Sequence, residues 1–186
     1  MTRPQRHAPS LCIVLATLAL VFGSSCKPRP QRGALPNEAT VALLGTVRAL
    51  HHQADVYEHA GDYARAAAAV QRVLAQELPA GFGEAEAVRV DAYGRLAELS
   101  LRQQRPDEAL SLADTGLREA RRESVLRARL LMVRGEVLSR LADRAREAQD
   151  TAGAARYRDE ALRALEDSIA LNQRVLRRAL GDGGSP

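Results

Sequence analysis

Side chains of metal-binding and proton-transferring types gather at one place in the chain: His51, His52, Asp55 and His59 lie within nine residues. On a straight helix His51 and His59 would be about 12 Å apart along the axis, whereas zinc–nitrogen bonds are only about 2 Å long. One ion therefore does not bind both. Asp55 and His59 could share an ion with ligands from elsewhere, but solvated polar residues are the favoured interpretation, so we predict no metal and no cofactor. As a milder role, His59 beside Asp55 could change charge near neutral pH.

Other motifs of catalysis or nucleic-acid binding do not stand out. The sequence has no phosphate-binding glycine loop, Ser/His/Asp constellation or buried carboxylate pair, so we predict that the protein is not an enzyme. Residues 118–146 are rich in arginine, but acidic residues interrupt them and they contain no aromatic side chain for base stacking. The 186 residues include 27 basic and 23 acidic ones, interleaved along the chain. We therefore predict no nucleic-acid partner.

The first 25 residues have the features of a signal peptide. Arg3 and Arg6 precede an apolar run of 13 residues, 11–23, which is too short for a transmembrane helix of about 20 residues. The small residues Gly23, Ser24 and Ser25 then lead directly to Cys26. Small residues before a cysteine at the end of such a run resemble the lipobox of bacterial lipoproteins.

This resemblance implies a signal peptide over residues 1–25, cleavage before Cys26 and lipidation of Cys26. Ordinary signal cleavage near Ser25, or retention of the segment as an anchor, are the alternatives. Residues 26–36 then form a basic, proline-rich linker, which at about 3.1 Å per residue spans roughly 30 Å. In lipoproteins of this kind a residue other than Asp after the cysteine commonly goes with the outer membrane, and Lys27 fits. We expect the domain to face the periplasm.

Apolar residues at helical spacing predict an all-α domain over residues 37–180. The predicted helices cover about 37–60, 63–78, 84–103, 106–121, 123–149 and 154–180, before a disordered tail at 181–186. On the first helix, Val41 and Leu44 belong to the predicted apolar face. On the last helix the residues that we expect to face inward are Leu162, Leu165, Ile169, Leu176 and Leu180.

Residues 47–80 and 90–123 share one plan. Ala54 aligns with Ala97, and Ala66 aligns with Ala109. This 34-residue helix–turn–helix resembles the tetratricopeptide repeat. The resemblance implies that the four alanines lie where the two helices of each hairpin approach most closely, which requires small residues.

A third unit matches if Gly135 and Ala161 take the same two places. They are 26 residues apart, where 12 is normal, and the excess makes almost four helical turns at about 3.6 residues per turn. We therefore expect an α-α superhelix of about three tetratricopeptide-like hairpins, the last one elongated. A generic helical bundle or a coiled-coil hairpin is the alternative.

In tetratricopeptide arrays the first helix of each repeat lines a concave groove. Carried over residue by residue, the groove positions are Arg48, His51, Asp55, Glu58 and His59, then Asp91, Gly94, Glu98, Leu101 and Arg102, then Arg129, Met132, Glu136, Ser139 and Arg140. Each set contains an acid followed four residues later by a base: Asp55/His59, Glu98/Arg102 and Glu136/Arg140. The favoured interpretation is that these pairs only stabilise exposed helices, by about 0.2–0.5 kcal/mol each. The alternative is that they bind a mixed-charge peptide, with an arginine holding a carboxylate.

Together these features predict a non-enzymatic, membrane-anchored lipoprotein that binds another envelope protein or a peptide segment, as a scaffold or assembly factor. The lipid bilayer is the second expected partner, through the anchor. Two alternatives remain open. The protein could self-associate as a structural bundle, a homo-oligomer formed through the long hairpin over 123–180. It could also be an accessory subunit of an exported cell-wall enzyme and supply binding without chemistry.

Overall fold

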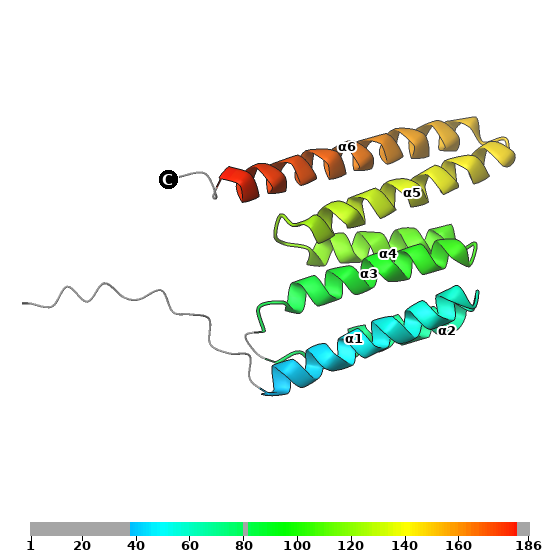
Figure 1. The fold of residues 1–186 in the computed structure, drawn as a ribbon. Coiled ribbons are helices and arrows are strands. Elements are labelled where there is room, and N and C mark those ends of the chain that lie inside the picture. Colours follow the sequence, from blue (N-terminus) through cyan, green and yellow to red (C-terminus); the bar gives the residue numbers. More distant parts are fainter. Residues whose placement is uncertain (1–37, 80–81, 182–186) are drawn as a thin grey trace, which may run out of the picture. The chain divides into compact units, whose positions relative to one another are not determined.

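The computed structural model describes residues 38–79 and 82–181. Over these residues the chain is all-α, as predicted, with six helices and no strand (Figure 1). The helices are α1 (Glu38–His59), α2 (Tyr63–Leu74), α3 (Ala85–Arg102), α4 (Pro106–Glu119), α5 (Val125–Glu147) and α6 (Thr151–Gly181). They pack as consecutive hairpins, α1 with α2, α3 with α4 and α5 with α6, while α2 packs on α3, α4 on α5, and α3 on α5.

The three hairpins turn in the same way. Each first helix is followed by a residue with positive φ: Gly61 at 74°, Gln104 at 62° and Gln149 at 60°. In each turn the next N–H donates to the carbonyl five residues back, as from Asp62 to Tyr57 at 2.9 Å. This is the Schellman arrangement, which satisfies carbonyls at a helix end. The third turn is therefore built like the first two, although only Gly61 of the three positive-φ residues is a glycine.

Small residues lie where the helices of each hairpin meet, as the sequence predicts. The four alanines at the predicted contact points are fully buried: Ala54, Ala66, Ala97 and Ala109. In the long hairpin, a Cβ added to Gly135 would lie 2.8 Å from the Leu165 side chain and 3.2 Å from the Ala161 carbonyl oxygen. The absence of a side chain at Gly135 thus lets α5 and α6 approach closely.

The core consists of two hydrophobic clusters, and α3 contributes to both. One cluster joins α1, α2 and α3 around residues such as Val70 and Leu99. The other joins α3, α4, α5 and α6 around residues such as Val137 and Leu138. Because α3 is packed on two sides, it fixes the position of the first hairpin relative to the last.

Two helix boundaries differ from the prediction, and local chemistry explains the second. α2 ends at Leu74 rather than near residue 78. Pro79 disfavours helical backbone only in Leu78, the residue before it, and this does not account for the end at Leu74. α6 begins at Thr151 rather than near residue 154, because the Asp150 carboxylate accepts a hydrogen bond from the Gly153 N–H at 2.8 Å and caps the helix.

The predicted inward face of α6 is wrong. Four of the residues expected inside are more than half exposed: Leu162 at 53%, Ile169 at 59%, Leu176 at 57% and Leu180 at 69%. The residues that α6 buries are smaller on average: Gly153, Ala161, Ala164, Ser168 and Leu171. Close approach to Gly135 selects this smaller face, whereas the prediction followed the larger apolar side chains.

Ser168 shows how a polar residue fits the buried face of α6. Its hydroxyl donates to the Ala128 carbonyl oxygen on α5 at 2.7 Å, so the buried polar group has a partner. A similar correction applies to α1, where Val41 is exposed and Leu43 is buried.

The predicted signal peptide over 1–25, Cys26, the linker and tail residues 182–186 lie outside the described residues. Within residues 38–79 and 82–181, no helix combines the length and apolar character needed to span a bilayer.

Candidate binding cleft

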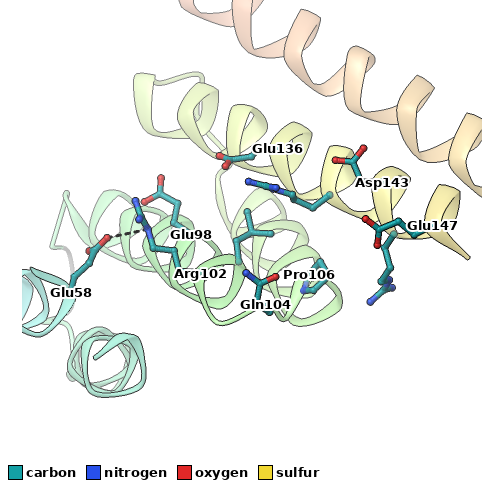
Figure 2. Close-up of a pocket in the computed structure, with 11 residues that line it drawn as sticks. Glu58, Glu98, Arg102, Gln104, Pro106, Glu136, Asp143 and Glu147 are labelled. Atoms are coloured by element: carbon teal, nitrogen blue, oxygen red, sulfur yellow. Dashed lines mark ion pairs between the residues drawn. The ribbon is translucent and has the colours of Figure 1, made fainter. Parts of the chain in front are cut away.

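A cleft of about 780 Å³ opens between α3 and α5. Figure 2 shows Glu98 and Arg102 on one wall and Glu136, Asp143 and Glu147 on the other. The full lining is Glu58, Glu98, Leu101, Arg102, Gln104, Pro106, Glu136, Arg140, Asp143, Arg144 and Glu147. Five of these residues are acidic and three are arginines, so the lining is strongly charged with an excess of carboxylates.

The cleft brings together only part of the predicted groove. Six of the fifteen predicted groove positions line it: Glu58, Glu98, Leu101, Arg102, Glu136 and Arg140. The other nine are not among its lining: Arg48, His51, Asp55, His59, Asp91, Gly94, Arg129, Met132 and Ser139.

Part of the lining lies on α5 beyond the groove positions that the sequence predicts. Asp143, Arg144 and Glu147 line the cleft, and the groove positions taken from the repeat end at Arg140. The helical spacing of three to four residues from Arg140 to Asp143 and Glu147 is the signal that could have found them. The longer α5 therefore extends the wall beyond the standard repeat.

The predicted acid–base pairs do not form within their helices over the described residues. Glu98 accepts two hydrogen bonds from Arg129 of α5, at 2.9 and 3.0 Å. Arg102 lies 3.4 Å from Glu58 of α1, as Figure 2 shows. The interpretation that Glu98 and Arg102 stabilise α3 by pairing with each other is therefore wrong.

The pair expected on α1 is wrong for the same reason. The Asp55 carboxylate pairs with Arg95 of α3. The His59 ring nitrogen Nδ1 instead lies 2.7 Å from the Asp55 backbone carbonyl oxygen. A guanidinium on the neighbouring helix reaches the carboxylate, which the spacing within one helix does not reveal.

Arg95 links α1 to α3. Within the described residues the backbones of α1 and α3 do not pack against each other, so side chains make the connection. The Arg95 guanidinium pairs with Asp55, lies 3.5 Å from Glu58 and donates to the His51 carbonyl oxygen at 3.3 Å. Its side chain is only 14% exposed, and charges that are partly shielded from water attract more strongly than exposed ones. Sequence spacing gave no sign of this role.

Arg129 makes the corresponding link between α3 and α5. Its guanidinium donates to Asp91 at 3.0 Å as well as to Glu98. The two carboxylates lie seven residues apart on α3, on one face of the helix. One guanidinium thus holds both ends of this face against α5.

His51 lies half-buried beside these links. Burial lowers its pKa from the usual 6.5, and this outweighs the opposite effect of the Asp91 carboxylate. The ring nitrogen Nε2 lies 3.7 Å from the Asp91 carboxylate. The two side chains form an ion pair only when the ring is protonated. Because its pKa is lowered and Asp91 already pairs with Arg129, His51 is neutral at pH 7 and serves as a packed polar residue.

Charges without partners remain on the α5 wall. Asp143 pairs with Arg146, and Arg144 donates to Asp107 at 2.6 Å. By contrast, three exposed side chains of the cleft make no hydrogen bond or ion pair within the described residues: Glu136, Arg140 and Glu147. The cleft therefore offers two carboxylates and one guanidinium to a ligand.

The titratable side chains of the lining are carboxylates and arginines. The lining contains no serine, threonine, cysteine, histidine or tyrosine, so it offers none of the usual side-chain nucleophiles other than carboxylates. Within the described ranges, no three His, Cys, Asp or Glu side chains gather closely enough to hold a metal ion.

No family model matches the sequence, no curated protein matches it, and no solved structure matches its fold. The interpretation of the cleft therefore rests on the geometry and chemistry of the residues that line it.

Proposed function

We propose that this protein is a non-enzymatic interaction module, a tetratricopeptide-like array whose cleft binds a segment of another protein. The observation that carries the proposal is the set of unpaired charges at Glu136, Arg140 and Glu147 on a wall whose neighbouring charges are all paired. Exposed charges on a rigid helix are suited to recognise a charged segment, because little ordering is needed on the protein side. The equivalent turns and the small residues at the hairpin contacts support the tetratricopeptide-like part of the proposal.

The spacing of the unpaired charges suggests what the segment carries. Glu136 and Arg140 are about 6 Å apart along α5, and Arg140 and Glu147 about 10 Å, at about 1.5 Å per residue. An extended strand advances about 3.3 Å per residue. A matching segment has two basic side chains about five residues apart, with an acidic side chain two residues from one of them. Arg140 would hold the acidic side chain bidentately.

Apolar contact is available beside these charges. Leu101 and Pro106 line the cleft. Met132 is exposed on α5, one turn before Glu136. A mixed-charge segment with an apolar residue near one end would use both features.

The place of action is part of the same proposal. The residues around Cys26 are the reason to place the protein in the cell envelope, as a lipoprotein of the outer membrane that faces the periplasm. Two or more acyl chains anchor a protein stably, whereas one does so only marginally. A tethered module with a binding cleft fits a scaffold or assembly factor for another envelope protein.

A pull-down from membranes tests the proposal. The full-length chain is compared with the double variant Glu136→Arg and Glu147→Arg, and bound proteins are identified by mass spectrometry. We expect at least one protein that the wild type retains and the double variant loses, because two attractive contacts become repulsive.

The matched control reverses charges away from the cleft. Arg121→Glu and Asp167→Arg lie on exposed positions outside the lining, and this variant should retain the same protein. If the cleft variant keeps every protein that the wild type binds, the proposed binding site is wrong.

A further inference from the structure

The outer face of α6 carries an apolar stripe that no other described helix covers. α6 packs against α5 and, within residues 38–79 and 82–181, against no other helix. Figure 1 shows the two helices side by side. The stripe consists of Leu162, Ile169, Leu176 and Leu180, each more than half exposed.

The spacing of the stripe is that of a helix-pairing surface. Leu162, Ile169 and Leu176 are seven residues apart, the repeat with which helices pair in coiled coils. From Leu162 to Leu180 the stripe is about 27 Å long at about 1.5 Å per residue. The exposed apolar residues of α1, Val41 and Val56, are fifteen residues apart and form no such row.

We infer that the stripe is a self-association surface, on which α6 of a second copy packs in antiparallel orientation around a two-fold axis near residue 171. The inference goes beyond the proposed cleft function and does not depend on it. A two-fold axis requires that each residue before position 171 finds a suitable partner at the same distance after it.

The sequence of α6 meets this requirement at two levels. Leu162 and Leu180 are equidistant from residue 171. Glu166 and Arg177 are centred half a residue after it. The same axis therefore sets leucine against leucine and acid against base, and symmetry makes each contact twice.

A polar residue midway along the stripe, at its edge, fits the same axis. Asn172 is exposed, and its side chain makes no hydrogen bond within the described residues. An axis near residue 171 sets Asn172 beside Asn172 of the second copy, where the two amides can exchange hydrogen bonds. A single asparagine in an apolar helix seam is known to fix register at some cost in stability.

Other arrangements fit less well. In a parallel pair, Glu166 and Arg177, which lie on the same flank of the stripe, would each face the other flank of the second copy, so this acid–base contact would not form. Residues 182–186 contain no large apolar side chain, so they offer nothing to cover the stripe.

α6, the helix that carries the stripe, is held in place by two arginine–glutamate contacts. Glu123, just before α5, accepts hydrogen bonds from Arg174 and Arg178 of α6, each at 2.9 Å. These contacts fix the second half of α6 on α5, opposite the stripe. The surface is therefore preformed, which lowers the cost of association.

Crosslinking in native membranes tests the orientation. Two tagged copies of the full-length chain are co-expressed, one with Glu166→Cys and one with Arg177→Cys, and treated with a short bismaleimide. We expect a crosslinked pair well above the background that Cys12 and Cys26 give in the wild type. Adding Ile169→Glu to both copies should remove the pair, whereas Val56→Glu on α1 should leave it. No pair above background, or stronger crosslinking of Glu166→Cys with itself, would overturn the inference.

Charge reversal tests the contact independently of cysteine chemistry. Glu166→Arg and Arg177→Glu should each reduce co-purification of two tagged copies from membranes, because each sets like charges together. The double variant Glu166→Arg with Arg177→Glu restores opposite charges and should recover the wild-type level. Unchanged co-purification in the single variants, or no recovery in the double variant, contradicts the antiparallel register.

Discussion

Charges on α3 and charges on α5 face the same cleft, but the protein uses them differently. On α3, Glu98 and Arg102 are engaged with neighbouring helices. On α5, Glu136, Arg140 and Glu147 have no partner within the described residues. The α3 charges therefore hold the hairpins in position, and the α5 charges are available to a ligand.

This difference has a geometric cause. α3 is packed between two hairpins, so arginines and carboxylates of α1 and α5 are within reach of its polar residues. The cleft side of α5 continues past the end of the opposite wall, because α3 ends at Arg102 whereas α5 runs on to Glu147. The elongation of the last hairpin thus adds Glu147 to the unpaired charges at Glu136 and Arg140, which lie within the standard repeat.

The largest expected effect on stability comes from a substitution that forces α5 and α6 apart. Gly135→Val sets a side chain against Leu165 and the Ala161 carbonyl oxygen, and overpacking of this kind costs about 1–3 kcal/mol. We expect the free energy of unfolding in urea to fall by about this amount. Gly45→Val on α1, where a Cβ meets nothing within 4 Å, is the control and should cause no such loss. Equal effects of the two substitutions would contradict the close approach of α5 and α6.

A smaller effect is expected from removing the link between α1 and α3. Arg95→Met leaves Asp55 and Glu58 without their guanidinium. The pair is only partly buried, so we expect a loss of about 1–2 kcal/mol in urea unfolding. The loss should shrink at high salt, which screens ion pairs. Arg140→Met is the control from the α5 wall, and if it destabilises the protein as much as Arg95→Met, the two walls do not differ as described.

His51 gives a pH-dependent test of the paired region. Its pKa is lowered in the folded protein, mainly by burial, so the unfolded chain binds a proton more readily. Stability from this residue is therefore present above pH 6.5, the ordinary value, and is lost as the pH falls below it. The wild type should lose more stability than His51→Asn between pH 7.5 and 5.5, by thermal unfolding. Parallel losses would show that His51 is not held neutral.

The smallest effect is predicted for the unpaired charges. Glu136→Gln combined with Arg140→Gln removes no contact within the described chain, so the free energy of unfolding should change by less than about 0.5 kcal/mol. Urea unfolding measures this directly. A loss comparable to that of Arg95→Met would assign these residues to the fold rather than to a ligand.

The features that the sequence predicted well are those encoded locally. The small residues at Ala54, Ala97 and Gly135 predicted the hairpin contacts, and the excess length between Gly135 and Ala161 predicted an elongated hairpin. Both depend on helix periodicity and on side-chain size, which a single sequence contains.

The features that it missed depend on which helices become neighbours. Spacing within α3 suggested that Glu98 pairs with Arg102, whereas Glu98 pairs with Arg129. On α6 two apolar faces were present, and only the position of Gly135 on α5 decides that the face with Ala161 is buried. These choices become visible only when the partner helix is in place.

Site-specific photocrosslinking tests the central claim most directly. A photoreactive residue is placed at Asp143, which lines the cleft, and in a second variant at Asp167, which lies on α6 outside it. Both full-length variants are irradiated in intact cells. The account predicts a protein crosslinked from position 143 and absent from position 167, and its loss when Glu136→Arg and Glu147→Arg are added. No crosslinked protein from position 143, or one that persists after the charge reversal, would contradict it.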